Sequence, residues 1–73
     1  MNGEMREVNA CGKRCPQPII DIARALKTYT SEDHFILLSD DPATESDLSA
    51  WSRLTGHLVE KQSAERFLVS RRA

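Results

Sequence analysis

The stretch "CGKRCPQPIIDIARALK", residues 11–27, decides how the chain is laid out. After Pro16, apolar residues recur along one helical face, at Ile19, Ile22, Ala23 and Leu26. Proline is tolerated in the first turn of a helix, because its missing N–H would have no partner there. The spacing therefore predicts a helix from Pro16 to about Thr28. Its solvent-facing residues would be Asp21, Arg24 and Lys27.

The segments that flank this helix predict strands. Met5 to Ala10 is short and mixed, whereas Phe35 to Leu38 is a continuous apolar run. A run without polar alternation is typical of a central strand that is covered on both faces. The polar segments "SEDH" and "SDDPATESD" bound this second strand, and the latter is rich in turn-forming residues.

A second helix is predicted after the acidic turn. Its helical period runs through Leu48, Trp51, Leu54 and Thr55. Thr44 or Ser46 is the expected N-cap, and Gly56 is the expected C-terminal stop. Trp51 lies on the apolar face, so it is expected in the core rather than in a ligand platform.

The last third of the chain predicts a hairpin. His57 to Gln62 and Arg66 to Arg71 are strand candidates, and "SAE" at Ser63 to Glu65 connects them. The order is therefore β-α-β-α-β-β within one domain that spans residues 1–73. Helices between strands predict an α+β fold, with a mixed, partly parallel sheet and the helices packed over it.

Composition narrows the function classes. The chain has 73 residues, 29% of them charged, and a formal net charge of -1. That charge provides no field toward nucleic acid or anionic membranes, and no apolar stretch is long enough to span a membrane. We therefore expect a cytoplasmic protein, monomeric when free, with no membrane contact and no direct nucleic-acid binding. Its two cysteines and two histidines lack metal-ligand spacing, so we expect no metal and no cofactor.

Two loops are the candidate site. A β-α-β crossover makes its two strands parallel, so their C-terminal ends share one edge of the sheet, where sites in such sheets gather. The segment "CGKRCPQP" follows the first strand, and "SDDPAT" follows the second. We expect these loops to be neighbours, with the N-terminal ends of both helices close by.

Cys15 is the candidate reactive residue of the first loop. It directly precedes the helix, so unpaired N–H groups and the positive end of the helix dipole favour its thiolate. Lys13 and Arg14 add nearby positive charge. Pro16 fixes the backbone after the sulfur, and Pro18 stiffens the first helical turn.

Other features limit what this thiol would do. Asp40 and Asp41 would raise its pKa unless they are paired or cap the second helix. No histidine lies close in sequence to act as a base, and Cys-x-x-x-Cys is not the spacing of Cys-x-x-Cys oxidoreductases. A lone activated thiol is better suited to carrying a group, such as sulfane sulfur held as a persulfide, than to hydrolysis. The alternative is an inert, buried cysteine that packs as a small hydrophobe.

The stretch "GKRCPQPII" resembles the Gly-x-x-Cys-Pro-x-Pro (CPxP) signature of the TusA/SirA-like sulfur carrier family. Gly12, Pro16 and Pro18 match the motif, and "DDPAT" at Asp40 to Thr44 extends the resemblance over nearly the whole chain. The family implies a two-layer fold similar to the C-terminal domain of bacterial translation initiation factor three. In that fold, a four-stranded mixed sheet carries two helices on one face.

The resemblance also implies a role for Cys15. It would accept persulfide sulfur from a cysteine desulfurase or rhodanese-like protein and relay it to an acceptor protein. The relay would feed tRNA thiolation, molybdenum cofactor biosynthesis or sulfur oxidation, and the protein would be a sulfurtransferase-type carrier rather than a free-standing turnover enzyme. Asn9 and Lys13 depart from the family's usual aspartate and apolar residue, and Cys11 is not required by the family.

Two rival functions stay open. One is a regulatory module that binds a partner protein without sulfur chemistry. The other is a thiol redox switch, in which the candidate redox partner Cys11 traps Cys15 as a disulfide. Residues 31–50 hold six acidic residues and no lysine or arginine, which we interpret as a solvated face with helix caps or as a partner-facing rim. The basic residues Arg66, Arg71 and Arg72 are expected to keep an edge strand soluble.

Overall fold

The computed structural model describes residues 6–72. Its elements are β1 (Arg6–Asn9), α1 (Gln17–Thr28), β2 (His34–Leu38), α2 (Thr44–Thr55), β3 (Leu58–Ser63) and β4 (Arg66–Ser70). The order β-α-β-α-β-β predicted from the sequence is confirmed. Met5, predicted as the start of the first strand, lies outside the described residues.

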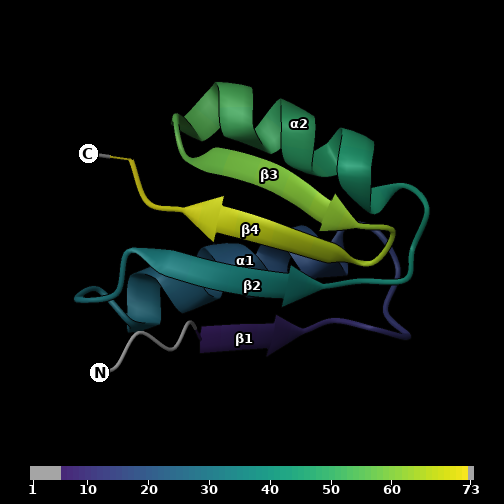
Figure 1. Ribbon diagram of the computed structural model, residues 1–73, viewed down its shortest axis with the longest axis horizontal. Helices are drawn as coiled ribbons and strands as arrows, with labels where there is room; N and C mark the ends of the chain where they lie inside the picture. The colour runs from purple at the N-terminus through teal and green to yellow at the C-terminus, as the bar shows by residue number, and fades with distance from the viewer. Residues whose placement is uncertain (1–5, 73) are drawn as a thin grey trace.

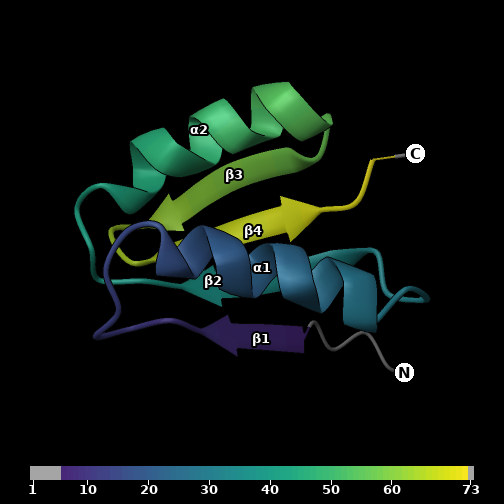
Figure 2. The same ribbon diagram turned by 180° about the vertical axis from the view of Figure 1, so that it is seen from behind.

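The four strands form one mixed sheet in the order β1-β2-β4-β3. β1 and β2 are parallel, while β4 pairs antiparallel with both β2 and β3. Figures 1 and 2 show the two helices covering one face of this sheet, as a β-α-β crossover followed by a second helix requires. The molecule is therefore an α+β two-layer sandwich. No helix within residues 6–72 is long and apolar enough to cross a membrane.

The core lies between the sheet and the two helices. It is built from alternate residues of the central strands and from one stripe on each helix, including Ile22, Leu26, Phe35, Leu37, Leu48, Phe67 and Val69. Ile36, on the other face of β2, is also buried, so the predicted burial of this central strand on more than one side is confirmed. Trp51 is half-buried against this core, and its ring stacks on His57 with centroids 5.3 Å apart.

The two helices differ from the predictions in detail. On α1, Ala25 is buried where Ala23 was expected, and Asp21 is half-buried rather than fully solvent-facing. The N-cap of α2 is Ala43, without a side-chain cap, because Thr44 turns its hydroxyl to Ser39 at 2.6 Å. Gly56 ends α2 in the left-handed conformation with φ 84°, as predicted.

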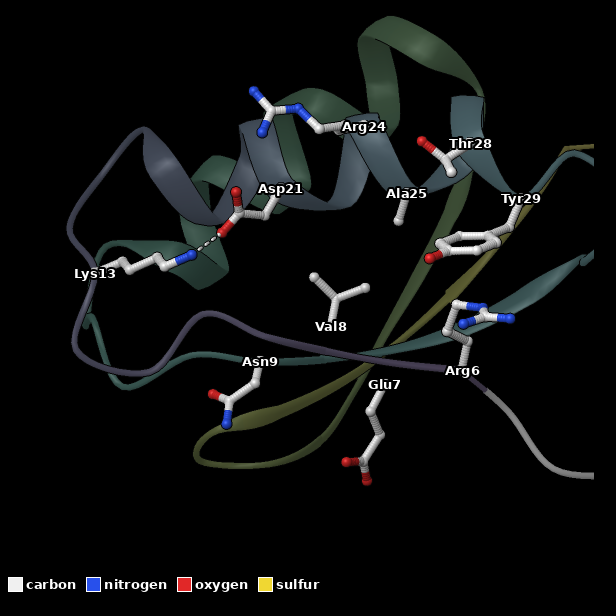
Figure 3. Close-up of a pocket in the computed structure, with 10 residues that line it drawn as sticks. All are labelled: Arg6, Glu7, Val8, Asn9, Lys13, Asp21, Arg24, Ala25, Thr28 and Tyr29. Carbon is white, nitrogen blue, oxygen red and sulfur yellow. Dashed lines mark hydrogen bonds and ion pairs between the residues drawn. The ribbon is translucent and has the colours of Figure 1, made fainter.

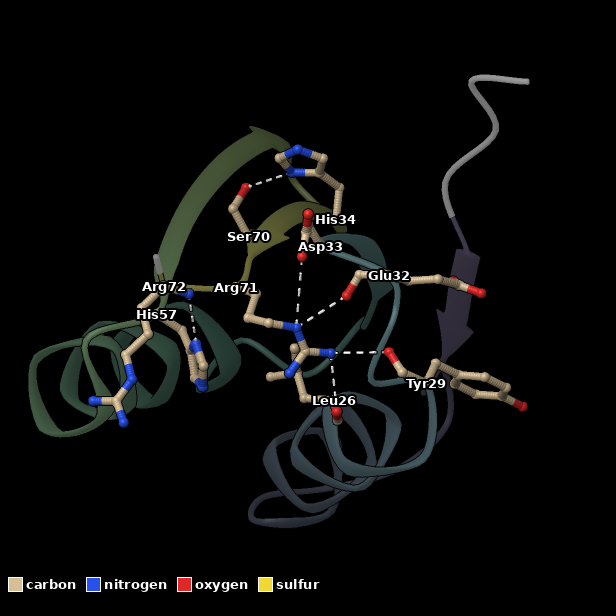
Figure 4. Close-up of polar contacts among 9 residues, drawn as sticks. All are labelled: Leu26, Tyr29, Glu32, Asp33, His34, His57, Ser70, Arg71 and Arg72. Atoms are coloured by element: carbon tan, nitrogen blue, oxygen red, sulfur yellow. Dashed lines mark hydrogen bonds and ion pairs between the residues drawn. The ribbon is translucent and has the colours of Figure 1, made fainter. Parts of the chain in front are cut away.

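Arg71 ties the exit of β4 to the C-terminal end of α1 (Figure 4). Its guanidinium donates hydrogen bonds to the carbonyl oxygens of Leu26, Tyr29 and Glu32 at 2.9 to 3.0 Å. Its backbone N–H donates to the carbonyl oxygen of Asp33. The expectation that these arginines only solubilise an edge strand is wrong for Arg71, because β4 lies inside the sheet and the side chain satisfies the last carbonyls of a helix.

Candidate functional site: the Cys15 loop

Two loops lie side by side at one end of the sheet, where β1 and β2 end (Figure 1). The backbone N–H of Gly12 donates to Asp40 Oδ1 at 2.9 Å, and that of Cys15 donates to Asp41 Oδ2 at 2.7 Å. The predicted proximity of "CGKRCPQP" and "SDDPAT" is therefore confirmed. Both predicted aspartates contact the backbone of the first loop rather than its cations.

Backbone hydrogen bonds also fix the start of the first loop. Ala10 is buried and extends the β1–β2 pairing through an N–H bond to the Leu38 carbonyl at 2.7 Å. The N–H of Lys13 returns to the Ala10 carbonyl, which closes a turn through Gly12 at φ 83°. That left-handed conformation favours glycine, which has no Cβ to crowd the following carbonyl. The motif glycine is thus required by the shape of the turn.

Asp41 joins the reactive loop to the start of α2. One carboxylate oxygen accepts the N–H of Cys15, and the other accepts the N–H of Ala43 at 3.0 Å. These two N–H groups, together with the charge of Arg14, hold the pKa of Asp41 below its ordinary value. Asp41 therefore stays ionised at neutral pH and keeps both hydrogen bonds.

The two predicted helix-start prolines take different positions. Pro16 is the exposed N-cap residue of α1, next to Cys15. Pro18 lies in the first helical turn and is fully buried. Pro18 therefore anchors the helix start in the core while the residues before it remain at the surface.

The thiol of Cys15 is exposed and free, so the alternative of a buried, inert cysteine is wrong. The expectation of a favoured thiolate is also wrong. A hydrogen bond from the thiol to Asp47 raises the pKa of Cys15, and partial loss of solvent and the charges of Asp47 and Asp41 raise it further. The two predicted cations do not counter this, because the Lys13 ammonium pairs with Asp21 at 2.9 Å and the charge of Arg14 acts on Asp41.

Asp47 is a residue of the site that the sequence analysis did not single out. It belongs to the first turn of α2, whose N-terminal end meets that of α1 at this loop. Acidic residues are favourable in a first helical turn. That preference, combined with the expected meeting of the two helix ends, is the signal that would have found it.

Cys11 is also exposed and free, but it has different neighbours. Partial loss of solvent and the charges of Asp40 and Glu65 raise its pKa. Its backbone N–H donates to the side chain of Asn9, so the asparagine that departs from the family pattern closes a local turn. Within residues 6–72, no group of three or more histidine, cysteine or acidic side chains is arranged to hold a metal ion.

These features define a class of protein. A small α+β domain presents one exposed thiol at the N-terminal end of a helix, in a loop whose backbone is held by a neighbouring carboxylate. Such a thiol is open to another protein, as expected of a group carrier.

The particular family follows from comparison. A family model described as sulfurtransferase TusA matches residues 6–70. The chain belongs to this family, so the resemblance read from its motifs is confirmed. Membership gives the chain a sulfurtransferase or sulfur-carrier role in general, with sulfur donor and acceptor proteins as its kinds of partner.

Proposed function

We propose that this protein is a persulfide carrier in which Cys15 accepts sulfane sulfur from a donor protein and passes it to an acceptor protein. The donor would be a cysteine desulfurase or a rhodanese-like protein, and the relay would run in the cytoplasm, where thiols stay reduced. One observation carries the proposal. The backbone of Cys15 is fixed through Asp41, while its side chain remains exposed to an approaching protein.

The transfer needs no external oxidant or reductant. The Cys15 thiolate attacks the terminal sulfur of a donor persulfide, a new S–S bond forms, and the donor's own sulfur leaves as a thiolate. Delivery reverses the roles. An acceptor thiolate attacks the outer sulfur on Cys15, and Cys15 leaves as the thiolate.

The resting state of the site suits a carrier that waits for its partner. Because the pKa of Cys15 is raised, the residue is a thiol at neutral pH and reacts slowly with unrelated oxidants. Its proton must leave when the donor docks. The carboxylate of Asp47, which raises the pKa of the thiol, is the acceptor for that proton in this proposal.

The remaining motif residues would act through the shape and charge of the loop. Gly12 and Asp40 hold the first turn, and Lys13 is engaged by Asp21 instead of the sulfur. Arg14 contributes to the low pKa of Asp41. Because the Arg14 side chain is exposed, it is also available to a partner surface. Pro16 and Pro18 fix the direction in which the chain leaves Cys15.

Mass spectrometry of the intact protein tests the proposal. Incubation with a cysteine desulfurase, cysteine and pyridoxal phosphate should add about 32 Da, removable by a reductant, because one thiolate accepts one sulfane sulfur. The gain should vanish in Cys15→Ser and persist in Cys11→Ser. If only Cys11→Ser abolished it, the reactive sulfur would be the other one. If competent donors load neither cysteine while a partner still binds Cys15→Ser, the protein is an interaction module.

A further inference from the structure

The outer edge of β1 is open. Figures 1 and 2 show β1 at the margin of the sheet, with β2 as its neighbour. The backbone N–H of Ala10 points to β2. Because the N–H and C=O groups of successive residues point to alternate sides of a strand, those of Val8 point to β2 as well. The N–H and C=O groups of Glu7 and Asn9 therefore point away from the sheet. No strand within residues 6–72 pairs with them.

The opposite edge of the sheet is protected. β3 carries a bulge between Lys61 and Ser63, and α2 packs beside it. Lys61 also forms an ion pair with Glu45 of that helix. Bulges, lysines and covering helices are the usual devices that keep an edge strand from pairing with another chain. β1 has only four residues and carries the charged Arg6 and Glu7, but its register with β2 is regular along its whole length, so it has no bulge.

A groove of about 330 Å³ runs between β1 and α1 along the open edge (Figure 3). Val8 and Ala25 face each other across it. Tyr29 and Arg6 line one end, and Lys13 lines the other. Because Lys13 belongs to the loop of Cys15, the groove leads from the open strand to the near end of that loop.

Of the cations that line this groove, one forms no ion pair within residues 6–72. The guanidinium of Arg6 pairs with Glu32 at 2.8 Å and stacks on the ring of Tyr29. Lys13 pairs with Asp21. Arg24 is exposed on the flank of α1 and makes no ion pair with any residue in 6–72. Figure 3 shows its side chain on the outer side of α1, so a segment lying along the groove would meet this positive charge at the groove's rim.

We propose that the edge of β1 docks an extended segment of the sulfur-accepting protein, which adds a strand to the sheet. Its backbone pairs with Glu7 and Asn9, an acidic side chain reaches Arg24, and its cysteine comes to the end of the groove next to the Cys15 loop. Main-chain pairing gives affinity in such complexes, and side-chain pockets give specificity. The sulfur step is the attack of the acceptor thiolate described above and rests on the proposed function, but the docking does not.

Nuclear magnetic resonance titration of the unloaded protein tests the docking. The probe is a short cysteine-bearing peptide of alternating valine and threonine with a central aspartate. The amides of Glu7 and Asn9 should shift and become protected from hydrogen exchange on binding, whereas that of Val8 is already protected by β2. N-methylation of the peptide on its β1-facing edge should weaken binding about tenfold or more, because several main-chain bonds are lost.

A charge exchange provides the matched control. Arg24→Glu should weaken binding of the aspartate peptide about threefold and strengthen binding of its lysine counterpart, as expected for an exposed ion pair. Lys27→Glu changes the same charge on the same helix outside this groove and should leave binding unchanged. Equal binding of the N-methylated peptide, shifts centred away from β1, or equal effects of the two charge reversals would overturn the proposal.

Because no persulfide is needed in this titration, its failure leaves the carrier function standing. Failure of Cys15 to load would, in turn, leave the docking result standing. With loaded protein, the peptide should accept sulfur faster than its N-methylated form. Equal transfer rates would overturn the assignment of this edge to the acceptor.

Discussion

The two ends of the sheet use the same kind of contact with opposite charge. At the thiol end, the carboxylates of Asp40 and Asp41 accept backbone N–H groups from the loops where helices begin. At the other end, the guanidinium of Arg71 donates to carbonyls where α1 finishes (Figure 4). Helices leave N–H groups unpaired at their start and C=O groups at their finish, so each end receives the charge that satisfies it.

The two ends differ in whether a functional group remains exposed. The Arg71 side chain is 23% exposed, and its donors are occupied by several carbonyls, so that end is closed. The aspartates hold the backbone of Gly12 and Cys15 and leave the sulfur exposed. One end therefore stabilises the fold, and the other presents a reactive group. Substitutions should separate these two roles.

The largest effect on stability is expected at the closed end. Arg71→Ala removes three side-chain hydrogen bonds and should lower the free energy of unfolding by about 2 to 4 kcal/mol. Urea denaturation measures this loss, and sulfur loading per folded molecule should be unchanged. Arg72→Ala, which loses one such bond to Thr55, is the matched control. Equal losses for the two variants would contradict the special role of Arg71.

At the thiol end, Asp41→Ala should affect function more than folding. The N–H of Cys15 loses its acceptor, so the thiol is held less firmly and sulfur loading should slow roughly tenfold. Asp41→Asn keeps one acceptor oxygen, so its rate of sulfur loading should fall between those of Asp41→Ala and the wild type. Loading kinetics followed by intact mass measure the effect. Wild-type loading by a folded Asp41→Ala protein would remove this aspartate from the account.

The two glycines in the left-handed conformation test the same separation of stability from function, with smaller expected effects. Gly12→Ala and Gly56→Ala should each cost about 1 kcal/mol of unfolding free energy, because both glycines have φ near +84°. A Cβ on Gly56 would also lie 3.3 Å from Arg72 Cδ, whereas one on Gly12 meets open space. Thermal denaturation should therefore rank Gly56→Ala as the less stable variant, while loading assays should find only Gly12→Ala slower. The reverse pattern in either assay would show that the two ends do not have these separate roles.

The smallest expected effect concerns the charge beside the sulfur. Asp47→Asn removes a negative group that raises the pKa of Cys15, so thiolate forms at lower pH. In a Cys11→Ser background, alkylation by iodoacetamide near neutral pH should speed up about threefold, and the pH–rate profile should move to lower pH. Glu45→Gln changes an acidic residue that pairs with Lys61 and should leave the profile in place. Coincident profiles for Asp47→Asn and wild type would contradict the assigned cause.

Local patterns predicted the fold well, because each element carries its own period and stop signals. The apolar stripe of α1, the buried run of β2 and the glycine that ends α2 all come from neighbours in sequence. The order β1-β2-β4-β3 depends on long-range pairing, and so the inner position of β4 and the role of Arg71 were missed.

The candidate site was likewise predicted from the sequence only in part. The crossover rule predicts from the sequence that the Cys15 loop and the aspartate loop lie together. The pKa of Cys15 was predicted in the wrong direction, because it depends on two distant side-chain choices. Lys13 pairs with Asp21, and Asp47 reaches the sulfur from α2. Sequence spacing does not determine either contact.

The most direct test of the carrier account is the fate of the sulfur after loading. Protein loaded by a desulfurase is freed of donor, mixed with a small thiol such as N-acetylcysteine and trapped with an alkylating agent. The account predicts a persulfide on the small thiol and a protein that returns to its original mass, lower by about 32 Da, with both cysteines reduced. Release of free sulfide with a protein about 2 Da lighter than its reduced form would contradict it, because that product is the Cys11–Cys15 disulfide of a redox switch.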